Sequence, residues 1–304
     1  MPVTVRFLGT SAALPTSQRG LPGIAIKYDG AIILFDCGEG TQRALMEAGW
    51  KLSGIRLICI SHLHADHVGG LLGILTTREF QGITRPVTII GPPGVSDFAG
   101  SILKYTYSHI QYPLEIKELQ GNGGIGYQDE NLAVHWAPLK HRVPTIGFLF
   151  VEHDKIGTFN VERAVTLGIP AGPLYGKLKA GEDITLPDGR IVRASTMVGP
   201  AIPGKRVAVI WDTKPCPNAY YLSENADLLA MESTFTQAHR DEADASDHCT
   251  AAQAAKIARK ANAKQLILTH ISARYQEPDP LLQEAIPIFE TTLIAHDGME
   301  FIVP

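Results

Sequence analysis

Apolar runs of strand length alternate with helix-like segments along the first half of the chain. The runs are rich in β-branched and apolar residues, are bounded by Gly, Pro or Asp, and predict strands at 3–9, 23–28, 31–36, 55–60 and 87–90. Helical spacing or composition predicts helices at 40–48, 66–76 and 94–104. Interleaved strands and helices are typical of a layered α/β fold.

The second half of the chain repeats this arrangement. Its pattern predicts strands at 207–211, 228–231, 265–269 and 292–295, and helices at 247–261 and 279–290. The segment 247–261 is the clearest helix, and Asp247 or Ser246 is its expected N-cap. The length of 304 residues suits one large domain or two small ones.

A different composition fills the stretch between the halves, at about 155–195. It is rich in Gly and Pro, and from Arg163 to Gly181 it has three basic residues and no acidic ones. One interpretation is a long surface loop. The other is a mobile binding arm, because long loops in compact domains are often functional. We expect a single domain over 1–304 with this flexible arm inserted.

Composition excludes some classes of protein. With 45% hydrophobic residues the chain can bury a large core, but no apolar run approaches the roughly 20 residues of a membrane helix. The N-terminus resembles a strand and not a secretory signal, so we expect a cytoplasmic protein without membrane contact. The net charge is −4, so a basic surface that binds nucleic acid must be a local patch.

The four cysteines form no CxxC pair; they are Cys37, Cys59, Cys216 and Cys249. We interpret them as reduced thiols in a reducing compartment, and as small buried residues. Because three of them lie next to motifs described below, a free thiol near the active site is the alternative.

The strongest chemical signal is the string Ser61-His-Leu-His-Ala-Asp-His67, directly after the predicted strand 55–60. It places His62, His64, Asp66 and His67 within six residues, although the chain has only 11 histidines. Neutral imidazole is a good zinc ligand, and a carboxylate can bridge to a second cation. A strand end followed by a helix start can point all four side chains at one centre. The string therefore predicts a metal site.

The HxHxDH string resembles the signature of the metallo-β-lactamase superfamily. Four further positions match that pattern, each where the chain leaves a strand-like segment: Asp36, His141, Asp212 and His270. The segment before His141 is 132–137. The resemblance implies a four-layer αββα sandwich and two Zn²⁺ ions per chain, with Mn²⁺ or another divalent ion as the alternative.

The resemblance also implies how the ligands are divided. One cation would be held by His62, His64 and His141. The other would be held by Asp66, His67 and His270, with Asp212 bridging the two and Asp36 as the supporting carboxylate.

Four segments resemble the ribonuclease Z family within that superfamily. They are the N-terminal segments 9–19 and 36–42, the stretch 168–181, and His270-Ile-Ser-Ala-Arg-Tyr275. The resemblance runs from residue 5 to about 275 and matches the short form, which works as a homodimer. It implies a tRNA 3′-end endonuclease, which removes 3′ trailers from precursor tRNA and leaves a 3′-hydroxyl.

The resemblance implies roles for further residues. Asp66 would orient the attacking water, and His248, partnered by Glu232, would be the general acid. Ser272 and Arg274 would contact phosphate, and the stretch 168–181, with Lys177 and Lys179, would clamp the tRNA.

The chain departs from the family pattern at three positions. Ala65 and Trp211 stand where glycines are usual, and Met231 replaces a histidine that is not a ligand. Substrate preference could therefore differ. Two alternatives stay open. One is a hydrolase of the same superfamily that acts on a small molecule (a phosphodiesterase, an arylsulfatase-like enzyme or a lactonase), and the other is a metal-free RNA-binding or scaffold protein with a dead site.

Overall fold

The computed structural model describes residues 2–304, which form two compact units. Unit 1 contains the chain up to Val151 together with Lys205–Pro304, and unit 2 is Glu152–Gly204. The stretch of about 155–195, in which we expected an inserted arm, lies within unit 2. Whether unit 1 and this insert behave as one domain with a flexible arm stays a prediction.

Unit 1 is built on two seven-stranded mixed sheets. The first sheet has the order β18 (Glu300–Ile302), β1 (Thr4–Gly9), β3 (Gly23–Tyr28), β4 (Ala31–Phe35), β5 (Ile55–Cys59), β6 (Val87–Gly91) and β7 (Leu114–Glu118). The second has the order β17 (Thr292–Ile294), β15 (Leu266–Thr269), β14 (Leu228–Glu232), β13 (Arg206–Ile210), β10 (Ile146–Glu152), β9 (Leu132–Pro138) and β8 (Gly124–Gln128).

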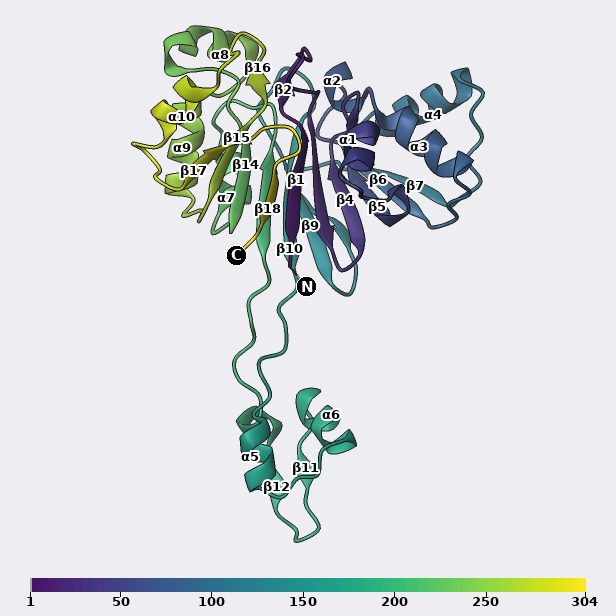
Figure 1. Cartoon of the computed structure of the whole chain (residues 1–304), viewed down its shortest axis with the longest axis vertical. Helices are drawn as coiled ribbons and strands as arrows, with labels where there is room; N and C mark the ends of the chain where they lie inside the picture. Colours follow the sequence, from purple (N-terminus) through teal and green to yellow (C-terminus); the bar gives the residue numbers. More distant parts are fainter. Residues whose placement is uncertain (1) are drawn as a thin grey trace. The chain divides into compact units, whose positions relative to one another are not determined.

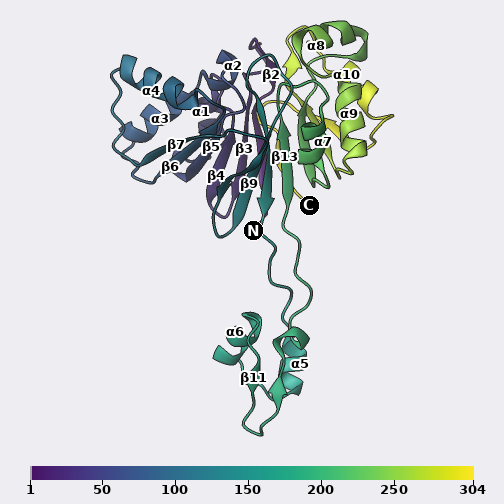
Figure 2. The same ribbon diagram turned by 180° about the vertical axis from the view of Figure 1, so that it is seen from behind.

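Helices cover the outer face of each sheet (Figures 1 and 2). The first sheet packs on α1 (Thr41–Glu47), α3 (Leu71–Phe80) and α4 (Val95–Tyr105), and the second packs on α7 (Pro217–Ser223), α9 (Ala251–Lys260) and α10 (Asp279–Ala285). A third apolar cluster, which includes Phe7, Phe35, Phe148 and Trp211, lies between the two sheets. The predicted αββα layers are therefore confirmed.

The central strands are buried on both faces because each sheet lies between helices and the other sheet. All residues of β4, β14 and β15 are buried, which explains why these strands appear in the sequence as unbroken apolar runs. Within these sheets the pairs β4–β5, β13–β14 and β14–β15 are parallel, so the carboxyl ends of neighbouring strands meet at one edge.

The predicted helix 66–76 is two helices, α2 (Ala65–Val68) and α3. The break falls at Gly69 and Gly70, where the chain passes very close to the loop after β4. A Cβ atom on Gly70 would lie 2.2 Å from the carbonyl oxygen of Gly38, so only glycine fits there.

The N-cap predicted for the helix 247–261 is wrong. Asp247 has a left-handed backbone with φ 62° and ends a separate helix, α8 (Arg240–Ser246). The next helix, α9, begins after Thr250, whose side chain and that of Gln253 form a reciprocal capping box. The histidine at 248 therefore lies between two helices. The other predicted helix, 279–290, ends earlier, at Ala285.

Unit 2 is folded around a small core of its own. It contains α5 (Val161–Thr166), α6 (Pro173–Lys179), and the hairpin β11 (Ile184–Thr185) and β12 (Ile191–Val192). Phe159, Leu178 and Met197 are among the buried residues of this core. Two antiparallel bridges, Lys155 with Ile202 and Phe159 with Val198, pair the outgoing and returning chain. The stretch 155–195 is therefore structured and is not simply a long loop.

Two smaller findings concern the cysteines and the membrane. All four cysteines are free and buried, as expected. Among residues 2–304 no helix has both the length and the apolar character that crossing a membrane requires.

Candidate metal centre

The predicted metal ligands come together where strands of the two sheets end. The first four, His62, His64, Asp66 and His67, lie in the segment that leaves β5 and enters α2. The remaining three follow strands of the second sheet: His141 after β9, Asp212 after β13 and His270 after β15.

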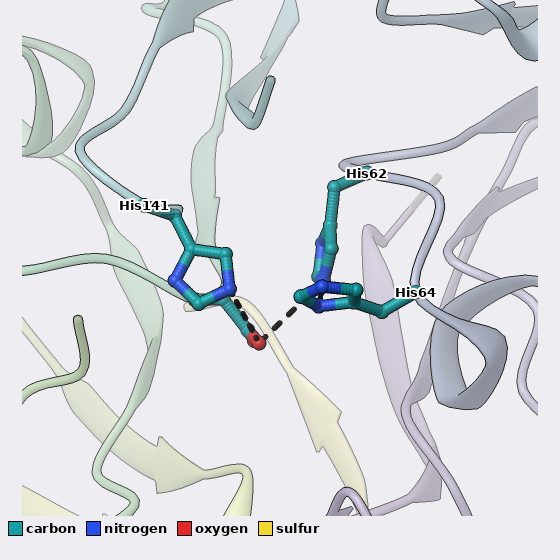
Figure 3. Close-up of side chains that lie close together, drawn as sticks. His62, His64 and His141 are labelled. Carbon is teal, nitrogen blue, oxygen red and sulfur yellow. Dashed lines mark hydrogen bonds and ion pairs between the residues drawn. The ribbon is translucent and has the colours of Figure 1, made fainter. Parts of the chain in front are cut away.

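The first group consists of His62, His64, His141 and Asp212, whose ligand atoms all lie within 4.8 Å of one another. Figure 3 shows the imidazoles of His62 and His64, which come from one loop, facing that of His141, which comes from another. The Nε2 atoms of His62 and His141 lie 3.5 and 3.8 Å from Oδ2 of Asp212. This grouping matches the ligand set that we expected for one cation.

The second group consists of Asp66, His67 and His270, and its ligand atoms also lie within 4.8 Å. The Nε2 atoms of His67 and His270 lie 3.4 and 3.1 Å from Oδ1 of Asp212. Oδ1 of Asp212 therefore faces one group and Oδ2 faces the other, as a bridging carboxylate requires. His248 also lies within 4.8 Å of Asp212 and His270, so a nitrogen outside the expected set faces the same space.

Several buried atoms of this cluster have no hydrogen-bond partner among the described residues. They include Nε2 of His67, His141 and His270, and Oδ1 of Asp212. Burying such atoms without a partner is costly. Imidazole nitrogens and carboxylate oxygens that converge in this way fit a divalent cation such as zinc, so the residues present fit a two-cation centre.

Hydrogen bonds outside the cluster orient the rings. Nδ1 of His67 lies 2.6 Å from Oδ2 of Asp36. The hydroxyl of Ser61 donates to the same oxygen, and the amide of Ser61 donates to Oδ1. Nδ1 of His141 lies 3.1 Å from the carbonyl oxygen of Asp247. When Nδ1 donates outward, Nε2 is the nitrogen left to bind a metal. The supporting position of Asp36 was predicted, whereas the contact from Asp247 was not.

Two of the strand ends have unusual backbone conformations. Asp36 and His270 are non-glycine residues with φ of 58° and 56°, in the left-handed region that costs energy for residues with a Cβ. Both turn sharply out of a strand, which directs their side chains into the cluster.

The electrostatics favour neutral imidazoles in part of the cluster. Burial lowers the pKa of His62 to about 2, so this ring is neutral at physiological pH and free to donate a lone pair. Burial also acts to lower the pKa of His67, but the carboxylates of Asp212 and Asp36 outweigh it and raise that pKa. A field that stabilises a proton on His67 would also attract a cation.

His248 and Glu232 form a buried pair beside the cluster. Nδ1 of His248 lies 3.1 Å from Oε1 of Glu232, while its Nε2 lies 4.0 Å from Oδ2 of Asp212. Burial alone would lower the pKa of His248, but the carboxylate of Glu232 outweighs it, and the pKa rises to about 9. Glu232 also accepts hydrogen bonds from the backbone amides of Thr213 and Cys249. Its network therefore supports the ionised form.

A cavity of about 310 Å³ opens over the metal cluster. Of the predicted phosphate contacts, Ser272 lines this cavity. Arg274 does not line it; its guanidinium lies 2.6 Å from Glu242 and 5.0 Å from the ring of Phe235, which does line the cavity. The backbone amide of Ala13, in the N-terminal loop, donates to Oδ2 of Asp66 at 3.0 Å.

The remaining predicted residues lie elsewhere. Lys177 and Lys179 are exposed on α6 in unit 2, and the ammonium of Lys179 lies 5.5 Å from the Phe159 ring. Trp211, where the family usually has glycine, is fully buried with its ring against those of His67 and His270, at centroid distances of 5.7 and 5.9 Å. This tryptophan therefore supports two of the ligand rings from behind.

Comparisons with known proteins agree with the fold and the site. A model of the family described as anti-Pycsar protein Apyc1 matches residues 3–118. Ribonuclease Z of Acaryochloris marina is 41% identical over 99% of this chain and 97% of its own length, and ribonuclease Z of Brevibacillus brevis is 41% identical over 96% and 94%.

Solved structures give the same result. Human tRNase Z, short form, superimposes with a TM-score of 0.72 at 28% identity, covering 99% of both chains. The metallo-β-lactamase fold protein YhfI of Bacillus subtilis shares the fold at 17% identity and a TM-score of 0.70, covering 99% of this chain and all of its own. With relatives about 40% identical over nearly its whole length, this chain belongs to the ribonuclease Z family of metallo-β-lactamase-fold hydrolases.

Proposed function

We propose that this protein is a metal-dependent endoribonuclease that removes 3′ trailers from precursor tRNA and leaves a 3′-hydroxyl on the tRNA. The observation that carries this proposal is near-full-length similarity to proteins named ribonuclease Z, together with the structural similarity to human tRNase Z. The grouped histidines and aspartates support it, because hydrolysis of a phosphodiester suits a site that fits two cations.

The proposed ligands of the first cation are His62, His64 and His141, and those of the second are Asp66, His67 and His270, with Asp212 between them. We propose zinc because five of these seven ligands are imidazoles. Two bound cations would supply charge stabilisation for the phosphate and would acidify a water molecule.

The protein's own residues would then handle the protons. The carboxylate of Asp66 orients the water and accepts its proton as the new bond to phosphorus forms. The bond from phosphorus to the 3′ oxygen breaks, and Nε2 of His248 gives that oxygen a proton. Glu232 is paired with Nδ1 of His248, so it orients the ring and holds it in the cationic form. The products are a 3′-hydroxyl and a 5′-phosphate.

Binding of the RNA would involve both units. Ser272, which lines the metal cavity, is the proposed phosphate contact nearest to the cluster. Arg274 would contact phosphate after leaving Glu242, and Lys177 and Lys179 would contact the tRNA from α6. Unit 2 as a whole has six Lys or Arg and six Asp or Glu, so its positive charge is concentrated at 163–181.

We further propose that the protein works as a homodimer in the cytoplasm. The support is the resemblance of this chain to the short form of the family. The superposition on human tRNase Z, short form, covers 99% of both chains. Sedimentation of the purified protein tests the dimer directly.

Incubation of the purified protein with a 3′-extended precursor tRNA tests the function. Mapping of both product ends should find one cut, with a 3′-hydroxyl on the tRNA and a 5′-phosphate on the trailer. An enzyme that hydrolyses bis(p-nitrophenyl) phosphate but leaves this RNA intact would instead be a small-molecule hydrolase. A protein inactive on both substrates, with no bound metal, would support the binding protein with a dead site.

A further inference from the structure

A second cavity lies beside the metal centre, on the other side of His141. We call it the side groove. Its volume is about 610 Å³, and it is lined by the segments that connect β6 to α4, β7 to β8, and β9 to β10. Cavities of about 300–1,000 Å³ are typical sites for small organic groups.

Many of the residues that line the side groove are apolar. Pro92, Leu119, Trp136, Leu139 and Val143 contribute apolar surface to it. Apolar and aromatic side chains pack against the faces of nucleobases without selecting one base. The wall that faces the β9–β10 segment carries Gln120, which is exposed.

Two residues connect the side groove with the metal cavity. His141 and Arg142 line both of them, so the two spaces adjoin. His141 is a proposed metal ligand, and the exposed side chain of Arg142 places a positive charge at the junction. A guanidinium at this point suits a phosphate backbone that passes from one cavity to the other.

We propose that the side groove is a nucleotide subsite, which binds the base of the first trailer nucleotide. This inference rests on the proposed RNA cleavage. His248, the proposed donor to the leaving 3′ oxygen of the tRNA, lines the metal cavity and is not among the described residues that line the side groove. The tRNA end therefore lies on the His248 side. The trailer, which keeps the phosphate, is the strand left to continue past Arg142.

The test compares two precursors with the unmodified enzyme. One carries a normal first trailer nucleotide, and the other has an abasic residue at that position. Because stacking of one base commonly contributes a factor of about ten or more, kcat/KM should fall about 10-fold on the abasic precursor. Equal kcat/KM on both precursors would overturn the proposal. This comparison requires no variant of the enzyme.

A variant then locates the effect. Gln120→Trp places a bulky side chain into the side groove from a wall that contains no proposed metal ligand. It should lower kcat/KM on the normal precursor about 10-fold and cause no further loss on the abasic one. Lys256→Trp, on the exposed side of α9, is the matched control and should behave like the unmodified enzyme. A Gln120→Trp enzyme that still distinguishes the two precursors as the unmodified enzyme does would overturn the proposal.

A third precursor, in which the last nucleotide of the tRNA is abasic, separates this proposal from its alternatives. If the 10-fold loss appears only when the last tRNA nucleotide is abasic, the side groove binds the tRNA strand and the trailer assignment is wrong. If the enzyme cuts none of the precursors, the proposed function itself fails, and the subsite proposal fails with it.

Discussion

At the scale of single residues, Glu232 raises the pKa of His248, and Asp212 contributes in the same direction. The pKa of His248 is raised to about 9, so the ring is cationic at neutral pH and loses its proton as the pH rises through about 9. In Glu232→Gln the raising effect of the carboxylate is lost. Burial is then the main influence on the pKa of His248, and we expect this pKa to fall. The alkaline limb of the pH profile of kcat/KM should then move to lower pH.

Single-turnover cleavage of precursor tRNA across the pH range measures this shift. Glu290→Gln, an exposed glutamate, is the control and should keep the original profile. An alkaline limb that stays near its original pH in Glu232→Gln would show that another group supplies the proton.

His248 itself can be tested with a modified leaving group. We expect His248→Ala to retain its metal and to slow cleavage by about 10²–10⁴, the usual effect of losing one general acid. A substrate with sulfur in place of the bridging 3′ oxygen should recover most of the loss, because thiolate leaves without a proton. Equal slowing on both substrates would point to a donor other than His248.

The proposed metal ligands predict how much metal the protein contains. Elemental analysis should find about two divalent ions per chain, and His64→Ala should bind less metal and lose hydrolysis while keeping its far-UV circular dichroism. His296→Ala, which removes an exposed histidine, should change neither metal content nor activity. Active protein without metal above background would contradict the two-cation centre.

At the scale of elements, the sequence predicted the ends of the strands that precede the proposed ligands but not the start of α9. His141, Asp212 and His270 each follow a buried strand whose apolar run is clear, so the ends of these strands could be predicted. The start of α9 was missed because candidate caps at 246 and 247 precede Thr250, although Thr250 and Gln253 have the spacing of a capping box in the sequence itself. The orienting carbonyl of Asp247 was missed because backbone groups leave no signature in a sequence.

The capping box makes a prediction about stability. Thr250 is fully buried, and its hydroxyl accepts a hydrogen bond from the backbone amide of Gln253 at 3.3 Å. Thr250→Ala should lower the free energy of unfolding by about 1 kcal/mol, measured by urea denaturation. Thr250→Ser keeps the oxygen and should lose much less. An equal loss in both variants would assign the effect to packing of the methyl group.

At the scale of the whole molecule, unit 2 has its own core. A deletion that tests its role must therefore remove the whole unit. A deletion of about 160–185 would cut through that core and leave part of it exposed. Lys155 and Ile202 are paired, so a short glycine linker between them removes the unit cleanly. We expect this deletion to impair cleavage of precursor tRNA and to spare hydrolysis of bis(p-nitrophenyl) phosphate.

The salt dependence of RNA cleavage provides a second measurement on the same variant. If Lys177, Lys179 and their neighbours contact phosphates, the deletion should flatten the plot of log kcat/KM against log salt concentration. Equal loss on RNA and on the small ester would mean that unit 2 supports the structure of the enzyme and does not bind RNA.

The position of the ligands along the chain has a consequence for synthesis. The segment 62–67 is made early, whereas His270 lies at the end of β15, a strand of the other sheet. A growing polypeptide on the ribosome therefore cannot assemble the centre until nearly all of it has been translated. A prematurely terminated fragment that lacks His270 lacks one of the proposed ligands, and we expect it to have no nuclease activity.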